Sequence, residues 1–342
     1  MWRSGIKWMF LIIGTMVGAG YASGRELWQF FGHESGLAIV LFTIFFIISV
    51  YITMKISYYH QTTDYLSVLE ILLGKKIARF YDVIIFFYLL STTVIMVAGS
   101  GATFEAFQLS KWLGIMVIIG FLLLVFLRGI QGILTLNAVI LPLLIVGLLT
   151  VLVYFTIDQQ LVFLLDLNHQ KNWSAAFLFT ALNILSILAV IGAVGNQVKS
   201  TGEIWIASIG SGLILGLTSF LYNNSLIQIA EVIILYEIPL FAILKNYPTI
   251  TYLLMSILLW FAIFTTAISS VLGIVTRLCK RFPYPLWKIA AVVLLFLIPL
   301  TNIGFSTLIA WLYPLYGALN LYLLCAIFLY PFIKDKQIMG DD

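Results

Sequence analysis

Long apolar stretches alternate with short polar segments along the whole chain. A membrane-spanning helix takes about 20 mainly apolar residues, and ten stretches reach or approach that length. No long polar linker divides them, so we expect one all-α integral membrane domain over residues 1–342. The ten predicted spans are 6–31, 36–55, 80–104, 110–127, 132–156, 174–196, 204–223, 249–276, 286–303 and 305–333.

The composition supports a membrane protein. Hydrophobic residues make up 62% of the chain and charged residues 9%, whereas a soluble domain carries about 25% charged residues. The net charge of +4 comes from basic residues scattered over short loops, which leaves no basic patch for a nucleic acid. Neither Cys279 nor Cys325 has a Cys or His at metal-ligand spacing, so we expect two free thiols.

Positively charged residues predict the orientation because they accumulate on the cytoplasmic side. With the N-terminus inside, all but four of the 18 Lys and Arg residues fall at cytoplasmic positions. The exceptions are Lys111, Lys171 and Lys245 in outside loops and Arg25 within the first span. Adding or removing one span would place positive clusters on both sides, so we expect ten spans with both termini in the cytoplasm. The N-terminal segment shows no cleavage site, and no removable signal peptide is expected.

Ten spans are compatible with two halves of five helices, about 6–156 and 174–333. Halves with an odd number of spans have opposite orientations, as in transporters built from inverted repeats. The halves share no clear sequence identity, so this arrangement rests on the span count and the expected helix breaks. Between spans, residues 224–248 place Glu231, Glu237 and Lys245 among apolar residues, which predicts an amphipathic re-entrant or interfacial helix.

The first span contains Gly14, Gly18, Gly20 and Gly24 within eleven residues. Each glycine destabilises a helix by about 1 kcal/mol relative to alanine. Close packing against another helix would explain them, because glycine lets two backbones approach. The alternative is a break near Gly18-Ala19-Gly20, whose free backbone groups bind a ligand.

Arg25 and Glu26 follow directly, at membrane depth or in a water-filled vestibule. Charges at that depth are costly and usually functional. They form either an ion pair near the outer interface or an outer gate or coupling site.

The run Gly-Thr-Met-Val-Gly-Ala-Gly-Tyr-Ala-Ser-Gly-Arg-Glu at 14–26 resembles the first-helix signature of the YkvI family of bacterial membrane proteins. That family is related to the amino acid–polyamine–organocation transporter superfamily. The run is also similar, more distantly, to the broken first helix of sodium-coupled symporters. The resemblance extends over the whole chain, since length and span count agree. It implies the leucine-transporter fold in the bacterial cytoplasmic membrane, with ten helices, a 5+5 inverted repeat, and helices 1 and 6 broken at mid-membrane.

The resemblance also implies a sodium site between the first break and the span 249–276. Carried over by position, its ligands are the carbonyls of Gly14, Val17 and Ala262 and the hydroxyls of Thr265 and Thr266. Oxygen ligands without charge suit a monovalent cation that must also leave. Alternatively, these hydroxyls only bond the carbonyl one turn before them. Thr15 and Met16 differ from the residues of sodium-dependent relatives, which argues against a second sodium site and leaves proton coupling through Glu26 or Glu105 open.

Polar residues inside the apolar spans predict a substrate site. Amides at Gly18 and Gly20 could hold an anionic group, and the second break is expected near Asn183 and Ser186. Asn183 would bind a second polar group unless it forms a single interhelical hydrogen bond. Gly99 and Gly101 are better explained by packing. The predicted substrate-binding residues are Gly18, Gly20, Tyr21, Phe179, Asn183 and Ser186, and the predicted gate or coupling residues are Arg25, Glu26 and Glu105.

The sequence contains no zinc-protease, nucleophile-elbow or phosphate-loop motif. We therefore expect no enzyme activity, no catalytic residue and no cofactor other than Na⁺ as a coupling ion. The favoured function is a secondary active transporter for a small polar or zwitterionic, amino-acid-like solute. The expected partners are that solute and the lipid bilayer, with a homo-oligomer as one possibility. A membrane receptor subunit on the same fold, as in germinant receptors, and a structural membrane protein are the alternatives.

Overall fold

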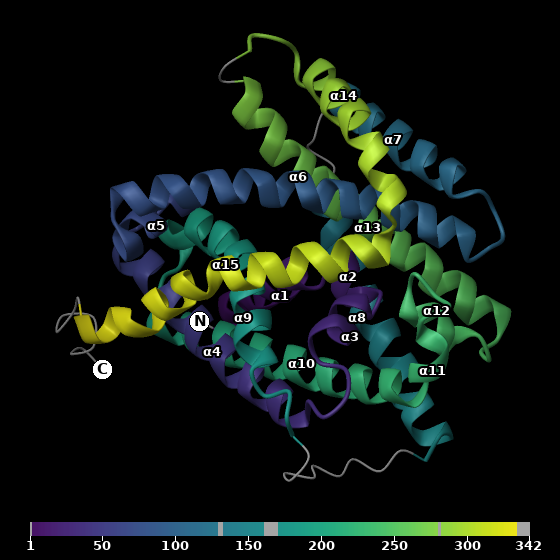
Figure 1. The fold of residues 1–342 in the computed structure, drawn as a ribbon. Helices are drawn as coiled ribbons and strands as arrows, with labels where there is room; N and C mark the ends of the chain where they lie inside the picture. The colour runs from purple at the N-terminus through teal and green to yellow at the C-terminus, as the bar shows by residue number, and fades with distance from the viewer. Residues whose placement is uncertain (1, 129–132, 161–169, 280–281, 334–342) are drawn as a thin grey trace.

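The computed structural model describes residues 2–128, 133–160, 170–279 and 282–333, which are almost entirely helical (Figure 1). The helices of the first half are α1 (Trp2–Met16), α2 (Ala19–Ala22), α3 (Arg25–Phe30), α4 (Gly36–Tyr59), α5 (Tyr65–Leu73), α6 (Lys75–Glu105), α7 (Lys111–Arg128) and α8 (Ile133–Asp158). Those of the second half are α9 (Ala175–Val194), η2 (Gly195–Gln197), α10 (Thr201–Gln228), α11 (Ala230–Ile233), α12 (Pro239–Leu244), α13 (Thr249–Cys279), α14 (Leu286–Leu297), η3 (Ile298–Ile303) and α15 (Phe305–Ile333).

The apolar stretches fold as the sequence predicts. Eight helical segments of the described chain are long and apolar enough to cross a membrane, and Lys111–Leu127 is a shorter apolar helix. The predicted first span is also helical, but it is divided into α1, α2 and α3. The chain is therefore an all-helical, multi-pass membrane protein. The ten-span count and the inverted repeat stay predictions.

The helices form two packed groups, with the short segments α2 and α3 of the divided first helix between them. In one group α10 packs along α1 and α4, and α4 also packs against α9. In the other, α6 packs against α13 and α7, while α14 contacts α7 and α13. In the middle, α2 contacts α13, and α3 contacts α9, α10 and α15. Figure 1 shows α6, α7 and α14 on one side of the molecule and α4 and α10 on the other.

The expected second break is absent. The α9 helix runs without interruption from Ala175 to Val194, through Asn183 and Ser186. Both polar side chains have partners in the continuous helix: Asn183 Nδ2 donates to the Phe179 carbonyl (2.8 Å), and the Ser186 and Tyr88 hydroxyls lie 2.9 Å apart. The prediction of a break near these residues is therefore wrong. Polar side chains alone do not unwind a helix when its own backbone and a neighbouring helix satisfy them.

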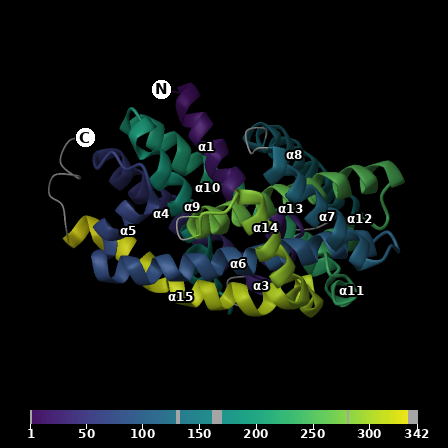
Figure 2. The same cartoon turned by 90° about the horizontal axis from the view of Figure 1, so that it is seen from above.

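Two short connecting regions lie at opposite ends of the bundle (Figures 1 and 2). At one end α5 begins at Asp64, whose carboxylate accepts from the Ser67 amide (2.9 Å), and ends at Gly74 with φ 78°. The start of α1 and the end of α15 lie toward this end. At the other end, the predicted re-entrant or interfacial segment forms α11 and α12. All six residues of α12 are buried, which accounts for the apolar character of that loop.

The structure leaves some positions of the orientation argument untested. Lys280, Arg281, Lys334 and Lys336 lie outside the described residues.

Candidate functional site

The first helix is interrupted between Met16 and Ala19. The Gly18 N–H bonds the Met16 carbonyl (2.8 Å), two residues back, instead of the Gly14 carbonyl four residues back. Gly18 itself has extended backbone, with φ −84° and ψ −176°. The carbonyl of Gly14 thus loses its helical partner and becomes available to a ligand. The predicted break is confirmed, and it lies at Val17–Gly18, at the start of the predicted glycine run.

A second interruption follows at Ser23–Gly24. Gly24 has φ 79°, a left-handed conformation that favours glycine. A Cβ at this position would also lie 2.7 Å from the ring of Tyr222 on α10. The chain therefore needs glycine here for both its backbone conformation and the close approach of α10. As a result, α2 is one isolated turn held between two irregular backbone segments.

The break lies beside the hydroxyl groups of α13. A Cβ on Gly18 would lie 3.6 Å from the Thr266 hydroxyl oxygen, so the two predicted halves of the sodium site are neighbours. Thr265 and Thr266 both donate to the Ala262 carbonyl, at 3.2 and 2.8 Å. These bonds match the alternative in which the hydroxyls satisfy their own helix. Because the hydroxyls act as donors in these bonds, their oxygen lone pairs remain available to coordinate a cation.

Gly14 sits close to α8, where its Cβ would meet the Leu141 side chain. Among the described residues, no group of three or more His, Cys, Asp and Glu could hold a metal ion. A cation at the break would therefore depend on carbonyl and hydroxyl oxygens.

Glu26 reaches back from α3 to the break. Its side chain is 5% exposed, and its Oε2 lies 2.7 Å from the position of a Cβ on Gly20. The Tyr313 hydroxyl of α15 lies 3.3 Å from the same position. The Asn183 amide of α9, which donates to the Phe179 carbonyl, lies near the Glu26 carboxyl. Four segments thus meet around one acidic side chain, and Gly20 leaves the space that the carboxyl occupies.

The other predicted substrate residues are placed differently. The Tyr21 hydroxyl donates to the Leu215 carbonyl (3.0 Å) and lies 2.9 Å from the Ser219 hydroxyl, so it ties α2 to α10. Phe179 is fully buried, and its ring lies 4.8 Å from those of Phe31 and Phe42. The structure therefore brings Gly20 and Glu26 together near Asn183, and Gly18 next to Thr266, whereas Tyr21 and Phe179 pack helices against one another.

At the second interruption, the first helix is bonded to α12 and α10. The Leu240 N–H donates to the Ser23 carbonyl (2.9 Å), and the Tyr222 hydroxyl donates to the Ala22 carbonyl (3.1 Å). These bonds satisfy carbonyls that the interrupted helix leaves free. Arg25 faces Glu237, which precedes α12, and Glu237 Oε2 accepts from the Ser306 amide (2.7 Å). Arg25, a predicted gate residue, thus lies at the α12 end of the site.

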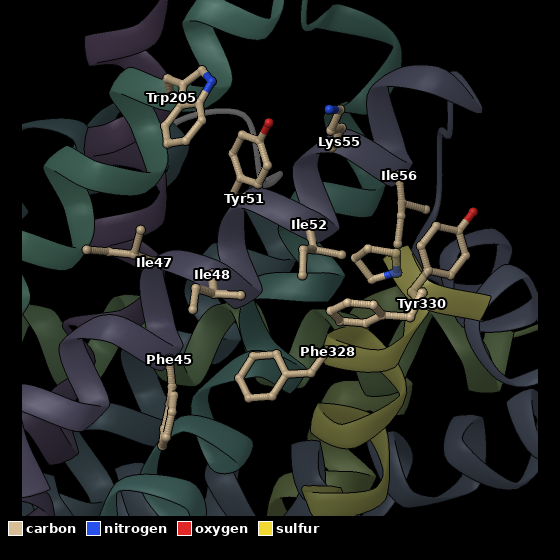
Figure 3. Close-up of a pocket in the computed structure, with 12 residues that line it drawn as sticks. Phe45, Ile47, Ile48, Tyr51, Ile52, Lys55, Ile56, Trp205, Phe328 and Tyr330 are labelled. Atoms are coloured by element: carbon tan, nitrogen blue, oxygen red, sulfur yellow. The ribbon is translucent and has the colours of Figure 1, made fainter. Parts of the chain in front are cut away.

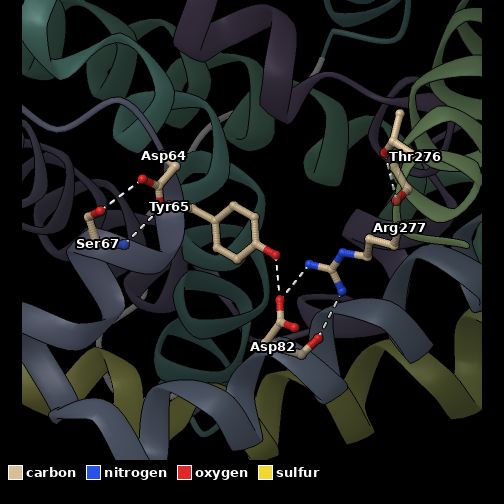
Figure 4. A network of polar contacts seen from close by, with 7 residues as sticks. Asp64, Tyr65, Ser67, Asp82, Thr276 and Arg277 are labelled. Atoms are coloured by element: carbon tan, nitrogen blue, oxygen red, sulfur yellow. Dashed lines mark hydrogen bonds and ion pairs between the residues drawn. The ribbon is translucent and has the colours of Figure 1, made fainter. Parts of the chain in front are cut away.

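Polar contacts also tie helices together at the α5 end. Arg277 of α13 pairs with Asp82 of α6 (2.7 Å), and the Tyr65 hydroxyl of α5 donates to the same carboxylate oxygen (2.5 Å), as Figure 4 shows. On the other helix group, Trp8 Nε1 of α1 donates to the buried carboxylate of Glu203 on α10 (3.0 Å). The first contact joins α6 and α13, and the second holds α1 against α10.

Two further features lie away from the break. Glu105, a predicted coupling residue, is exposed at the C-terminal end of α6, so the structure does not bring it together with Glu26. A groove of about 470 Å³ lies between α4, α10 and α15, with apolar side chains such as Phe45, Trp205 and Phe328 along it and Lys55 at one end (Figure 3). None of the predicted site residues lines this apolar groove.

Sequence reasoning missed Tyr313, Tyr88 and Glu237. Each is a polar side chain in or beside an apolar stretch, and this is the sequence feature that could have indicated them. The first two lie on spans far from the first helix in sequence, and nothing in the apolar pattern indicates which faces of those spans turn toward it. In the sequence, Glu237 is one of the charged residues of the segment 224–248, and nothing there indicates that it lies near Arg25.

Comparisons with known proteins agree with this architecture. No family model matches the chain. The chain is 49% identical over 334 residues to the uncharacterized protein YyaD of Bacillus subtilis (strain 168), across 98% of this chain and 99% of YyaD. It is 28% identical over 324 residues to the uncharacterized membrane protein YkvI of the same organism, across 91% and 92% of the two chains.

Solved transporter structures share the fold. MhsT in complex with L-phenylalanine matches with a TM-score of 0.67 and 17% identity, over 96% of this chain and 89% of MhsT. A manganese transporter of Eremococcus coleocola matches with a TM-score of 0.56 and 15% identity, over 95% and 78%. Mhp1, a nucleobase-cation-symport-1 family transporter, matches with a TM-score of 0.51 and 16% identity, over 96% and 77%. The chain thus has the leucine-transporter fold, and it belongs to the family of YyaD, with YkvI as a more distant homologue.

Proposed function

We propose that this chain is a secondary active transporter that moves a small polar or zwitterionic, amino-acid-like solute across the cytoplasmic membrane. The observation that carries the proposal is the interruption of the first helix at Val17–Gly18, beside the hydroxyls of α13. Irregular backbone inside a membrane is tolerated where it lines a site or a cavity. In transporters built on broken helices, such backbone coordinates solute and ion. MhsT, which shares the fold, was solved with L-phenylalanine.

The proposed framework is a domain over 1–342 with ten spans and two inverted halves, about 6–156 and 174–333. Its support is the agreement between predicted spans and observed helices, together with the shared fold. In the part of the chain that the structure describes, the first helix is interrupted near its middle, whereas α9, the corresponding helix of the second half, is continuous. The movement that opens the site would then centre on α1, α2 and α3.

The proposed coupling ion is Na⁺, with H⁺ as the alternative. Na⁺ would take the carbonyls of Gly14, Val17 and Ala262 and the hydroxyls of Thr265 and Thr266. Support comes from the free Gly14 carbonyl and from the position of Thr266 next to Gly18. The solute would lie against the backbone at Gly18 and Gly20, near Asn183 and Ser186.

The two sides of the interrupted first helix differ in exposure, and this difference supports alternating access. On one side of the break, α12 is buried and its Leu240 N–H bonds the Ser23 carbonyl. Toward the α5 end, Thr15 and Thr266 are partly exposed and Ser269 is exposed. We infer that this conformation is closed on the α12 side, and that opening there requires α12 to move.

Uptake into proteoliposomes with and without an inward sodium gradient tests the proposal. Radiolabelled L-phenylalanine and L-leucine are suitable first solutes, and we expect gradient-driven accumulation of at least one amino acid in a wider panel. Solute binding without accumulation in any gradient would favour the receptor alternative and contradict the transporter.

The sodium site is tested separately. Thr265→Ala and Thr266→Ala should raise the sodium concentration that gives half-maximal uptake by about tenfold, because each removes one oxygen ligand. Thr276→Ala is the matched control, since its hydroxyl makes the same bond to its own helix (2.8 Å to the Leu272 carbonyl) further from the break. Unchanged sodium dependence in both site variants would show that the site is wrong.

A further inference from the structure

Glu26 is the one predicted gate or coupling residue that the structure places inside the proposed site. Its carboxyl lies against Gly20, with the Tyr313 hydroxyl beside the same backbone position. Tyr21 and Tyr88 are also close enough to interact with it electrostatically. The carboxyl therefore lies against α2, the turn that follows the interruption, beside the Tyr313 hydroxyl.

No cationic side chain neutralises this carboxyl. Among the described residues, none forms an ion pair with Glu26. Its sequence neighbour Arg25 faces Glu237 on the outer side instead. The titratable groups near Glu26 are Tyr21 of α2, Tyr88 of α6 and Tyr313 of α15. The α9 helix contributes the Asn183 amide, and Tyr222 of α10 lies next to Tyr21. All are neutral at physiological pH.

A buried carboxylate surrounded by neutral groups is costly. The group must therefore hold a proton or face a bound cation. We propose that Glu26 binds the ammonium group of the solute and that this binding releases a proton from Glu26. The inference rests on the proposed function and specifies its solute class: a small solute with a cationic nitrogen. The exchange balances, since a neutral carboxylic acid and an ammonium give a carboxylate–ammonium pair and one free proton.

The surroundings of Glu26 suit an ammonium ion. Three or more acceptors are needed to replace the water around its N–H groups, and the carboxylate with the Tyr313 and Tyr88 hydroxyls can supply them. The face of a tyrosine ring also attracts a cation. Gly20 lets Glu26 and Tyr313 lie directly against α2, because a Cβ there would meet both. An anionic group on the same solute would lie nearest the interrupted backbone at Gly18.

The test is isothermal titration calorimetry on the purified full chain, with matched solutes. One set is L-phenylalanine, 2-phenylethylamine and 3-phenylpropanoate; the other is L-leucine, 3-methylbutylamine and 4-methylpentanoate. Titrations in phosphate and in Tris at the same pH count the protons released. We expect at least one amine-bearing solute to bind with release of about one proton, and neither carboxylate-only solute to bind.

Variants separate recognition from folding. Glu26→Gln should weaken amine binding about tenfold or more and abolish proton release, because the amide has no charge to offer. Glu26→Asp keeps the charge and should retain proton release. Glu105→Gln removes an exposed acid and should leave both quantities unchanged; melting temperature checks the fold of each variant.

The outcomes are distinguishable from those of the uptake assay. Binding of no amine, or amine binding without proton release, overturns the assignment of Glu26. The same holds if Glu26→Gln binds amines as tightly as the unaltered chain. Gradient-driven uptake of a solute without an amine would keep the transporter and overturn this inference. Proton-coupled amine binding without transport would support the role of Glu26 and contradict the proposed transporter.

Discussion

At the residue scale, the conformation of Gly24 makes a direct prediction about stability. Gly24→Ala should lower the free energy of unfolding by about 2 kcal/mol, because alanine is strained at φ 79° and its Cβ would press on Tyr222. Thermal unfolding in detergent measures the change. Gly120→Ala is the matched control: that glycine lies in α7 with no atom within 4 Å of the added Cβ. Equal melting temperatures for the two variants would contradict the proposed need for glycine at 24.

Individual residues also show how far the sequence could lead. The cluster of glycines and the adjacent Arg25-Glu26 pair correctly indicated an interrupted helix, since neither is stable in a continuous span in lipid. The identity of the residues opposite the break could not be predicted in the same way. Asn183 was among the predicted site residues, but Tyr313 reaches Glu26 only because α15 packs against α3, and that packing depends on the shapes of many apolar side chains. Hydrophobic patterns alone do not contain this information.

At the element scale, Asp82 holds α5, α6 and α13 together. Asp82→Asn should destabilise the fold by about 1 kcal/mol, a modest value because the Asp82 side chain is 42% exposed and the Arg277 side chain 23%. Chemical denaturation or a melting curve at low salt measures it. Asp64→Asn is the control at the start of α5, because asparagine caps a helix about as well as aspartate. A larger loss for Asp64→Asn would argue against this role of Asp82.

The contact between α12 and the first helix predicts a gate. Because the Leu240 amide bonds the Ser23 carbonyl, cysteines at these two positions should form a disulfide. In a background with Cys279→Ser and Cys325→Ser, oxidised Ser23→Cys/Leu240→Cys should lose at least about nine-tenths of its uptake. Reduction should restore it. Each single cysteine variant should be insensitive to oxidant, and full uptake by the cross-linked protein would exclude α12 as a moving cover.

Element boundaries were predicted best where the apolar pattern is strong and worst where polar residues interrupt it. The spans 249–276 and 305–333 match α13 and α15 closely, because lipid requires a continuous helix there. The prediction of a second break was wrong for the same physical reason: lipid favours a continuous helix. In α9 the polar side chains bond within the helix or to Tyr88, so the helix has no need to unwind.

At the scale of the whole molecule, the two ends of the bundle should lie on opposite sides of the membrane. Lys245 is exposed at the end that holds α12, and Lys288 is exposed near the start of α14. In the same cysteine-free background, a membrane-impermeant maleimide added to intact cells should label Lys245→Cys and leave Lys288→Cys unlabelled. Inside-out vesicles should give the opposite pattern. The expectation follows from the excess of basic residues on the side of Lys288. Labelling of Lys288→Cys in intact cells would invert the orientation, and α12 would then cover the cytoplasmic entrance to the site instead of the outer one.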